Sequence, residues 1–209
     1  MSYHTMRAEQ TRAAIMAVAE RLFAERGITA VSNRQISEAA GQGNTAAVAY
    51  HFGTRTDLIN AILREHTDAM DEIRRQMLIA HAGSTQLRDW VTCAVRPITD
   101  HLAGLDTPSW YARFAAQLMT DPKLRALVID DVADSPTIQQ AVDGLNRCLP
   151  DLPARVRVQR NDLVRTLVVH ACAEREQNLA DGARMGWDET ATVLIDAVMG
   201  LLLAPVTCG

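Results

Sequence analysis

The chain has 209 residues, of which 48% are apolar, so it can form one small and one larger domain with a real core. Its N-terminus is polar and has no apolar run, so no secretion signal is expected. The apolar stretch from Thr190 to Val206 is interrupted by Asp196, ended by Pro205 and shorter than the roughly 20 residues of a membrane-spanning helix. We therefore expect a cytoplasmic protein.

The formal net charge of −4 by itself argues mildly against nucleic acid as a partner. The charges are unevenly distributed, however. Residues 1–60 contain six arginines and five acidic residues, whereas the remainder contains 15 basic and 20 acidic residues. The excess acidity lies outside the first sixty residues, so the total charge does not decide whether the N-terminal part binds DNA.

The first predicted helix runs from Arg7 to Arg26, because apolar residues recur on one face at helical spacing. After it, Ser32 and Gln35 have the spacing of a capping box, in which each side chain satisfies an early backbone N–H group. This pattern predicts a short helix over residues 33–40. Gly41 ends that helix, because glycine adopts the left-handed conformation without steric cost.

A tight turn and a second short helix are predicted next. Residues 42–44 form the turn, and Thr45 to His51 form the helix. Several alanines keep this helix narrow enough to lie deep in a major groove. At the start of the following helix, Thr54 and Arg55 place a hydroxyl and a guanidinium beside free N–H groups, a combination that favours phosphate. A helical hairpin in a protein core is the alternative, and these flanking residues favour DNA.

Residues 7–63 resemble the DNA-binding domain of the TetR family of transcriptional regulators. The matching residues recur in the family's order and nearly its spacing: Thr11, Ile15, Ala19, Leu22, Phe23, Gly27, Ser32, Ile36, Ala40, Gly41, His51, Phe52, Arg55 and Leu58. The resemblance covers about the first third of the chain. It implies an all-α protein with an N-terminal three-helix helix-turn-helix domain over residues 1–60. It further implies a C-terminal helical ligand-binding and dimerisation domain over residues 61–209.

The resemblance also implies which residues contact DNA. Those expected to face bases are Thr45, Ala46, Ala47 and Tyr50, together with Arg34, whose guanidinium fork suits the O6 and N7 atoms of guanine. Those expected to hold phosphates are Ser32, His51, Thr54 and Arg55, and the predicted surface also includes Asn33 and Asn44.

Two departures from the family pattern affect this surface. The turn around residues 42–44 carries one additional residue, and the family's usual phosphate-binding tyrosine falls on Ala49, with Tyr50 one place later. Either Tyr50 takes over that contact or the contact is lost. The register of base contacts stays open.

A long helix is predicted from Thr56 to about Ala80, with a polar segment from Arg64 to Asp71 that suggests a connector between two domains. The resemblance implies that this helix links effector binding to the position of the DNA-binding domain. Further helices are predicted over residues 85–105 and after Thr107–Pro108, Asp121–Pro122 and Ser135–Pro136.

The larger domain is expected to hold an apolar pocket for a small-molecule effector. Small-molecule sites combine apolar and aromatic walls with a few polar groups. The candidate lining residues are Trp90, His101, Trp110, Tyr111 and Phe114. For each of them taken singly, a place in the core is favoured over a place in a pocket.

The last two predicted helices are Ala154–Ala183 and Asp188–Leu203, and the second is apolar on nearly every side. A helix with so little polar surface needs burial all round. Pairing with the same helices of a second copy supplies that burial as a four-helix interface. The alternative is docking into its own domain, and with the resemblance we favour a homodimer.

No sequence motif of an enzyme is found, such as GxSxG, a P-loop, HExxH or a Rossmann glycine pattern. His170, Glu174 and Glu176 share one predicted helix, where a solvated face is favoured over a metal site. The four cysteines have no metal-binding spacing and indicate reduced thiols. Neither a metal nor another cofactor is expected.

These features together predict a ligand-responsive repressor that binds a palindromic operator in double-stranded DNA as a homodimer. A small-molecule effector releases it. The alternatives are a small-molecule carrier or enzyme with a vestigial DNA-binding module, and an architectural DNA-binding protein without an effector. Activation in place of repression also stays open.

Overall fold

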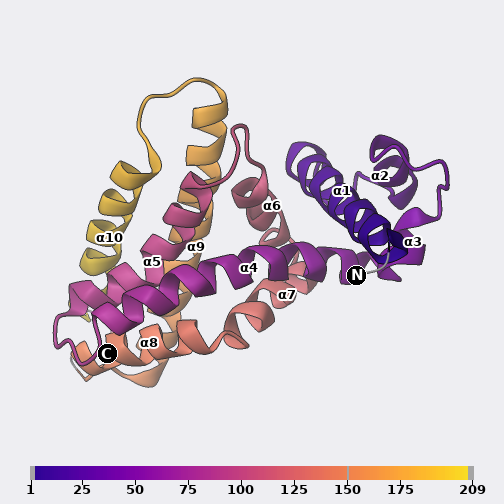
Figure 1. Ribbon diagram of the computed structural model, residues 1–209. Coiled ribbons are helices and arrows are strands. Elements are labelled where there is room, and N and C mark those ends of the chain that lie inside the picture. Colours follow the sequence, from indigo (N-terminus) through magenta and orange to yellow (C-terminus); the bar gives the residue numbers. More distant parts are fainter. Residues whose placement is uncertain (1–2, 150, 207–209) are drawn as a thin grey trace.

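The computed structural model describes residues 3–149 and 151–206, and over these ranges the protein consists of ten helices without a strand (Figure 1). The predicted all-α class is confirmed. The helices are α1 (Tyr3–Arg26), α2 (Asn33–Ala39), α3 (Ala47–Phe52), α4 (Arg55–Ala80), α5 (Leu87–Ala103), α6 (Tyr111–Leu118), α7 (Pro122–Ala133), α8 (Pro136–Cys148), α9 (Ala154–Ala180) and α10 (Trp187–Leu203).

The first three helices gather at one end of the molecule, around the beginning of α4 (Figure 1). Their core consists of side chains with almost no exposed surface: Ile15, Ala19, Phe23, Ile36, Val48, Leu58 and Ile59. Gly27 and Gly41 adopt positive φ angles of 86° and 68° at the ends of α1 and α2, as glycine allows. This end of the molecule is the expected helix-turn-helix domain.

Two helix starts in the helix-turn-helix domain differ from the sequence prediction by two residues or more. The first helix begins at Tyr3 instead of Arg7. The second helix of the helix-turn-helix begins at Ala47 instead of Thr45. The reason lies in Asn44, whose side-chain oxygen accepts a 2.9 Å hydrogen bond from the N–H group of Ala46 and so extends the turn by two residues.

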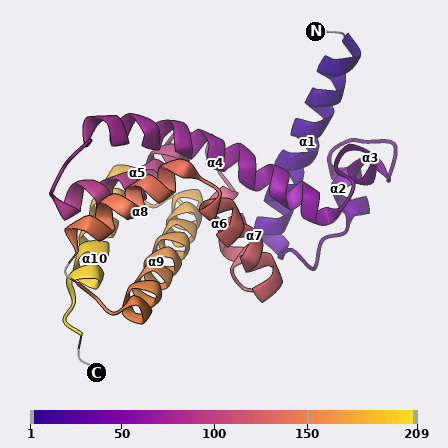
Figure 2. The ribbon, with the colours of Figure 1, turned by 90° about the horizontal axis from the view of Figure 1, so that it is seen from below.

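Helix α4 continues without a break from the small domain along the larger one (Figures 1 and 2). It begins with a capping box in which the Thr54 hydroxyl accepts a hydrogen bond from the N–H group of Asp57. Along its length it contacts α1 and α3 first, then α5, α7 and α8. The connector role predicted for this helix is therefore geometrically possible: one continuous helix touches both parts of the protein.

The larger domain packs α5 between α4, α8 and α10, while α9 lies against α6 and α10. The predicted starts of α7 and α8 are confirmed, with Asp121 and Ser135 as their N-caps and a proline in each first turn. Arg160 on α9 donates hydrogen bonds to the carbonyl groups of Leu202 and Ala204 and so holds the end of α10. Over the described ranges, none of the helices combines the length and apolar character that a membrane crossing requires.

Candidate nucleic-acid interface and ligand cavity

Helix α2 begins with the predicted capping box. The N–H group of Gln35 donates to the Ser32 hydroxyl at 3.2 Å, and the Ser32 N–H group donates to the Gln35 side chain at 2.8 Å. The side chain of Arg34 is 75% exposed, and its guanidinium pairs with Glu38 one turn further on at 2.7 Å. Arg34 is therefore available on the outer face of α2. Next to it, Asn33 is half-buried.

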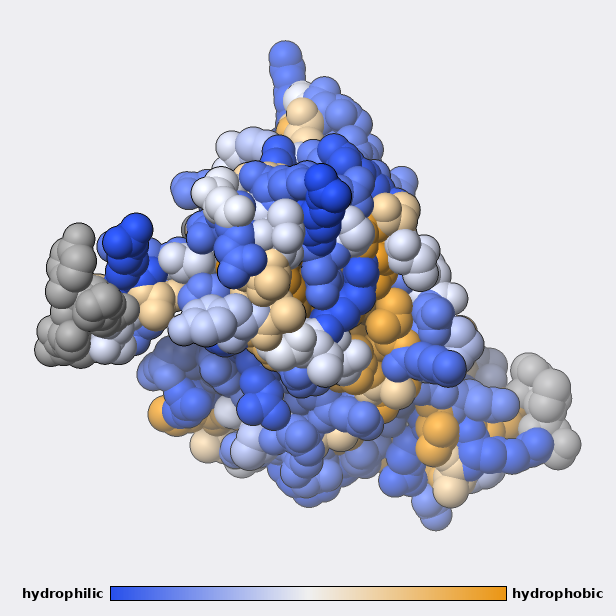
Figure 3. Space-filling model, turned by 90° about the vertical axis from the view of Figure 1, so that its right-hand side faces the viewer, coloured by the Kyte–Doolittle hydropathy of each residue, from blue (hydrophilic) through white to orange (hydrophobic). Residues whose placement is uncertain are grey.

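Helix α3 and the turn before it present a face of mostly small side chains to solvent. Thr45, Ala46 and Ala49 are exposed, and Tyr50 is the most prominent side chain, with 82% of its surface exposed. The ring of Tyr50 meets the ring of His51 edge-on at 5.0 Å between centroids. Figure 3, which looks onto this end of the molecule, shows a mostly hydrophilic surface.

Ala47 does not face outward, contrary to its predicted contact with bases. Only 5% of its surface is exposed, and it belongs to the apolar core together with Val48 and Phe52. Because α3 starts two residues later than predicted, position 47 falls in the first turn on the inner side. The exposed side chains of α3 and of the turn before it are therefore Thr45, Ala46, Ala49 and Tyr50.

Arg55 also points inward, so its predicted contact with phosphate is corrected. Its guanidinium donates hydrogen bonds to the carbonyl groups of Ile28 and Val31 and lies 5.0 Å from the centre of the Phe23 ring. This burial lowers the pKa of Arg55. The side chain therefore holds the segment between α1 and α2 against α4, and it is not free to bind DNA.

The other predicted phosphate contacts are partly engaged. The Thr54 hydroxyl donates to the Asp57 carboxylate at 2.6 Å. His51 is half-buried, and its carbonyl group accepts a hydrogen bond from Arg12, whose guanidinium lies 4.2 Å above the centre of the Phe52 ring. Arg34 and Tyr50 thus remain accessible polar side chains of the predicted surface.

The junction between the two domains contains a chain of three polar side chains from three helices. Nε2 of His66 on α4 lies 2.8 Å from a carboxylate oxygen of Glu20 on α1. Nδ1 of the same ring lies 2.7 Å from Nε2 of His101 on α5. The ring of Tyr111 on α6 stacks on His66, with 3.8 Å between centroids. One imidazole therefore contacts the small domain, the large domain and α6 at once.

The larger domain encloses a cavity of about 270 Å³, close to the lower end of the roughly 300–1,000 Å³ typical of ligand sites. Its wall is mostly apolar and is supplied by α4 to α9, with one residue of α10. The polar or charged members of the wall are Thr67, Arg74, Tyr111, Asp131, Asn161 and Arg165. The expectation of an apolar pocket with a few polar groups agrees with this cavity.

Of the five residues proposed from the sequence to bind ligand, only Tyr111 lines the cavity. Trp90 is buried elsewhere: its indole N–H donates to the carbonyl group of Ser84 at 2.9 Å, and its ring fills the space left by Gly144. Phe114 stacks on Phe23 of α1 at 6.0 Å. These aromatic side chains pack between helices, so they are not part of the cavity wall.

His101 and Trp110 are the other two proposed residues that lie outside the cavity wall. His101 contacts His66 at the domain junction. Trp110 is half-buried beneath the guanidinium of Arg113, which lies 4.4 Å from the ring centre.

Sequence reasoning missed Glu20, His66 and Asp131. The signal was present for Asp131, because it is a carboxylate between Val128 and Val132, two apolar residues on α7 that also line the cavity. Glu20 and His66 gave no such signal, since their contact joins positions 46 residues apart.

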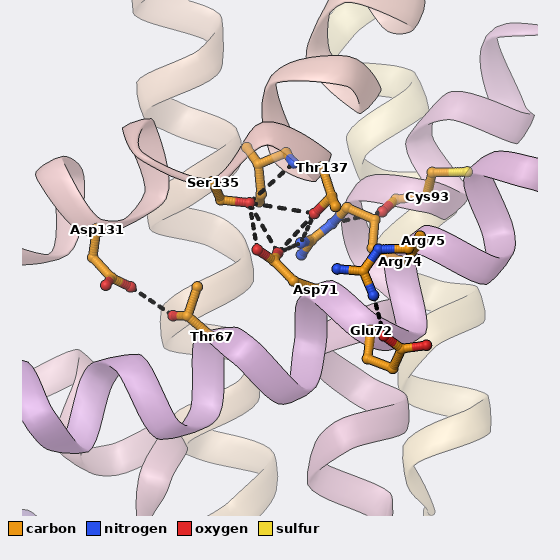
Figure 4. A network of polar contacts seen from close by, with 10 residues as sticks. Thr67, Asp71, Glu72, Arg74, Arg75, Cys93, Asp131, Ser135 and Thr137 are labelled. Atoms are coloured by element: carbon orange, nitrogen blue, oxygen red, sulfur yellow. Dashed lines mark hydrogen bonds and ion pairs between the residues drawn. The ribbon is translucent and has the colours of Figure 1, made fainter.

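A polar network behind the cavity fixes α4 against α8. The buried guanidinium of Arg74 pairs with Asp71 at 2.5 Å and donates to the hydroxyl of Thr137 and the carbonyl group of Cys93 (Figure 4). Asp71 in turn accepts hydrogen bonds from Ser135 and Thr137 at 2.9 and 2.7 Å. The charges in this part of the wall are therefore already paired.

Glu176 was expected on a solvated face with His170 and Glu174, and for Glu176 this is wrong. It is buried and accepts hydrogen bonds from the N–H groups of Ala112 and Arg113 at 3.1 and 3.0 Å. These are free N–H groups of the first turn of α6, so Glu176 attaches that helix to α9. His170 and Glu174 are exposed as expected.

Comparison with known proteins agrees with this architecture. The family model described as "Bacterial regulatory proteins, tetR family" matches residues 15–62, which cover most of the helix-turn-helix domain. The HTH-type transcriptional repressor AcnR of Corynebacterium glutamicum is 27% identical over 151 residues, or 72% of this chain. Residues 15–62 thus match the DNA-binding domain of the TetR family of transcriptional regulators, and the comparisons support a regulator of this type. The match spans 65% of the length of AcnR.

Solved structures of TetR-family regulators share the fold over nearly the whole chain. A putative regulator from Rhodococcus sp. has a TM-score of 0.56 at 18% identity, covering 92% of this chain and 99% of that one. LfrR from Mycobacterium smegmatis, solved in complex with proflavine, has a TM-score of 0.52 at 20% identity, covering 94% and 98%. At these identities the likeness is one of fold alone.

Proposed function

We propose that this TetR-family regulator is a repressor that binds a palindromic operator as a homodimer in the cytoplasm and is released by a small molecule. The observation that carries the ligand response is the position of α6. Its Tyr111 forms part of the cavity wall, and its Phe114 stacks on Phe23 of α1 in the DNA-binding domain. A molecule that moves α6 therefore changes both the cavity wall and the contact between α6 and the DNA-binding domain.

The energy required for such a response is modest. Coupling free energies between two sites are typically about 1–3 kcal/mol, which changes operator affinity by roughly 5- to 150-fold. Tyr111 also stacks on His66, which contacts Glu20 of α1. A ligand that binds more tightly to one position of α6 favours the matching position of the DNA-binding domain. The shift in this equilibrium equals the difference in the ligand's binding free energy between the two positions.

The DNA contacts that we propose follow the exposed side chains. Tyr50 faces the major groove from α3, and Thr45 and Ala46 face it from the turn before this helix. Arg34 reaches the groove from α2. Ser32 holds a backbone phosphate near the start of α2. In a dimer the two recognition helices enter successive major grooves about 34 Å apart, which requires a palindromic site.

The proposed homodimer uses the outer faces of α9 and α10. Both helices leave large apolar side chains exposed: Val158, Leu163, Val193 and Leu203. Substituting Val193 with glutamate should convert the dimer to a monomer in analytical ultracentrifugation. Ile79→Glu, which changes an exposed apolar residue of α4, is the matched control and should remain dimeric.

The decisive experiment for the repressor proposal is selection of genomic DNA fragments by the purified protein, followed by titration of the best fragment at increasing salt. We expect one enriched palindrome, bound by two subunits, with affinity that falls steeply as salt rises. Reporter expression from that site in cells with and without the protein then distinguishes repression from activation. Binding that is independent of sequence would contradict the proposal.

A further inference from the structure

The three charged side chains of the cavity wall differ in whether they have a counter-ion. Arg74 pairs with Asp71 at 2.5 Å, and Arg165 pairs with Asp162 at 2.8 Å. Asp131 forms no ion pair with any part of the chain that the structure describes; its carboxylate accepts one hydrogen bond, from the Thr67 hydroxyl at 2.6 Å (Figure 4). The wall therefore contains one carboxylate without a cation.

The surroundings of Asp131 increase the need for a positive partner. Burial raises the pKa of its carboxyl group, and the nearby carboxylates of Asp68 and Asp71 act in the same direction. The Thr67 hydroxyl and the guanidinium of Arg64 oppose them. Asp131 is half-buried, so its carboxylate is partly removed from water, and a cation placed beside it stabilises the charged form.

We infer that the effector of the proposed repressor is a small apolar molecule carrying one protonated amine, and that this amine binds Asp131. The inference rests on the proposed function, because it names the class of ligand for the same cavity. The apolar wall receives the body of the molecule, and the Asp131 carboxylate receives its charged end. The volume of about 270 Å³ limits the ligand to a small molecule.

An anionic ligand is the main competitor, because two arginines also line the cavity. The Nε atom of Arg165 is buried and has no hydrogen-bond partner, so it can donate to an oxygen of a ligand. Its charge, however, is already balanced by Asp162, as that of Arg74 is by Asp71. Counting these pairs, the wall has an excess of one negative charge, which selects a cation over an anion.

The test uses three probes with one apolar skeleton: phenylbutylamine, phenylbutanol and phenylbutyrate. Their binding to the full-length protein is measured by calorimetry at about pH 7, where an alkyl amine is protonated. We expect the amine to bind about tenfold or more tighter than the alcohol, as one charge-assisted hydrogen bond in a half-buried site provides. Phenylbutyrate should bind more weakly than the alcohol.

Asp131→Asn is the critical variant, because asparagine keeps the shape and can still accept the hydrogen bond from Thr67. In this variant the preference for amine over alcohol should disappear, while the affinity for the alcohol stays within about twofold. Asp68→Asn removes the same charge from an exposed position of α4 outside the wall and should keep most of the preference. Thermal unfolding of both variants confirms that they fold.

Three results would overturn the inference: tightest binding of phenylbutyrate, equal binding of all three probes, or an amine preference that survives in Asp131→Asn. Failure of the repressor proposal gives a different pattern. In that case the amine binds through Asp131, but the protein selects no DNA fragment with or without it. Calorimetry without DNA and fragment selection without ligand therefore report on the two proposals separately.

Discussion

Glu20 and His66 join the first helix of the DNA-binding domain to the long connector helix through a contact of 2.8 Å. The same imidazole contacts His101 of α5 and lies under the ring of Tyr111, which is part of the cavity wall. The imidazole of His66 thus connects Tyr111 in the cavity wall with Glu20 in the DNA-binding domain. A local change in the cavity therefore has a short physical path to α1.

Glu20→Gln should weaken this path without changing its shape. An amide forms a weaker hydrogen bond with the imidazole than a carboxylate does, so we expect a loss of about 1 kcal/mol in unfolding free energy. The coupling free energy between ligand and operator, obtained from the operator affinities without and with ligand, should fall by about 0.5–2 kcal/mol. Urea unfolding and operator titration measure the two quantities. Glu25→Gln, on the exposed side of the same helix, should change neither.

The stability of the protein should fall as the pH drops from about 6.5 towards 4. Burial, with a smaller contribution from the charge of His66, lowers the pKa of His101 from 6.5 to about 4. Between these values the unfolded chain binds more protons at this position than the folded protein, so stability rises with pH. Urea unfolding at a series of pH values measures the slope.

The control for this pH dependence is the difference between two histidine variants. His101→Gln should reduce the slope between pH 4 and 6.5, because it removes the titrating group. His170→Gln on the exposed face of α9 should leave the slope as in the original protein. An identical slope in all three proteins would show that His101 does not cause the effect.

Arg34→Ala should weaken operator binding by roughly 1–3 kcal/mol and relax selectivity at one base pair. The side chain is 75% exposed and, within the described residues, pairs with Glu38 on the same helix, so the unfolding free energy should change little. Titration of operators with single base changes measures the selectivity. Unchanged discrimination at every position would contradict the assigned contact.

Arg55→Ala should have the opposite profile, with a large loss of stability and no specific effect on DNA. Removing the guanidinium leaves the carbonyl groups of Ile28 and Val31 without their partner, at a cost of about 2 kcal/mol. Below the unfolding transition, the salt dependence of operator binding should keep its slope. A shallower slope in the variant would show that Arg55 does contact a DNA phosphate.

Gly144→Ala should destabilise the larger domain by about 1–3 kcal/mol, because a methyl group at this position would lie 2.1 Å from the ring of Trp90. Trp90 is almost completely buried and cannot move without losing its hydrogen bond to Ser84. Thermal unfolding measures the loss. Gly43→Ala introduces the same methyl group into open space and serves as the control, with little change expected.

Features that depend on neighbouring residues could be predicted from the sequence. The capping box of Ser32 and Gln35 and the proline starts of α7 and α8 are examples. Each results from hydrogen bonds or steric limits within a few residues, which the sequence displays directly. The additional turn residue can be recognised in the sequence, but its effect cannot. In the structure, the hydrogen bond from the N–H group of Ala46 to Asn44 moves the start of α3, and Ala47 faces inward.

The helical class, the helix-turn-helix and the family resemblance could be predicted because they follow from local spacing and apolar periodicity. Which polar and aromatic side chains meet depends on the tertiary structure. Trp90 became a core residue because Gly144 leaves room for it, and Arg55 became structural because two carbonyl groups more than twenty residues earlier lie within its reach. Asp131 entered the cavity wall because six other helices enclose that space. Such contacts join residues far apart in the chain, so no local pattern specifies them.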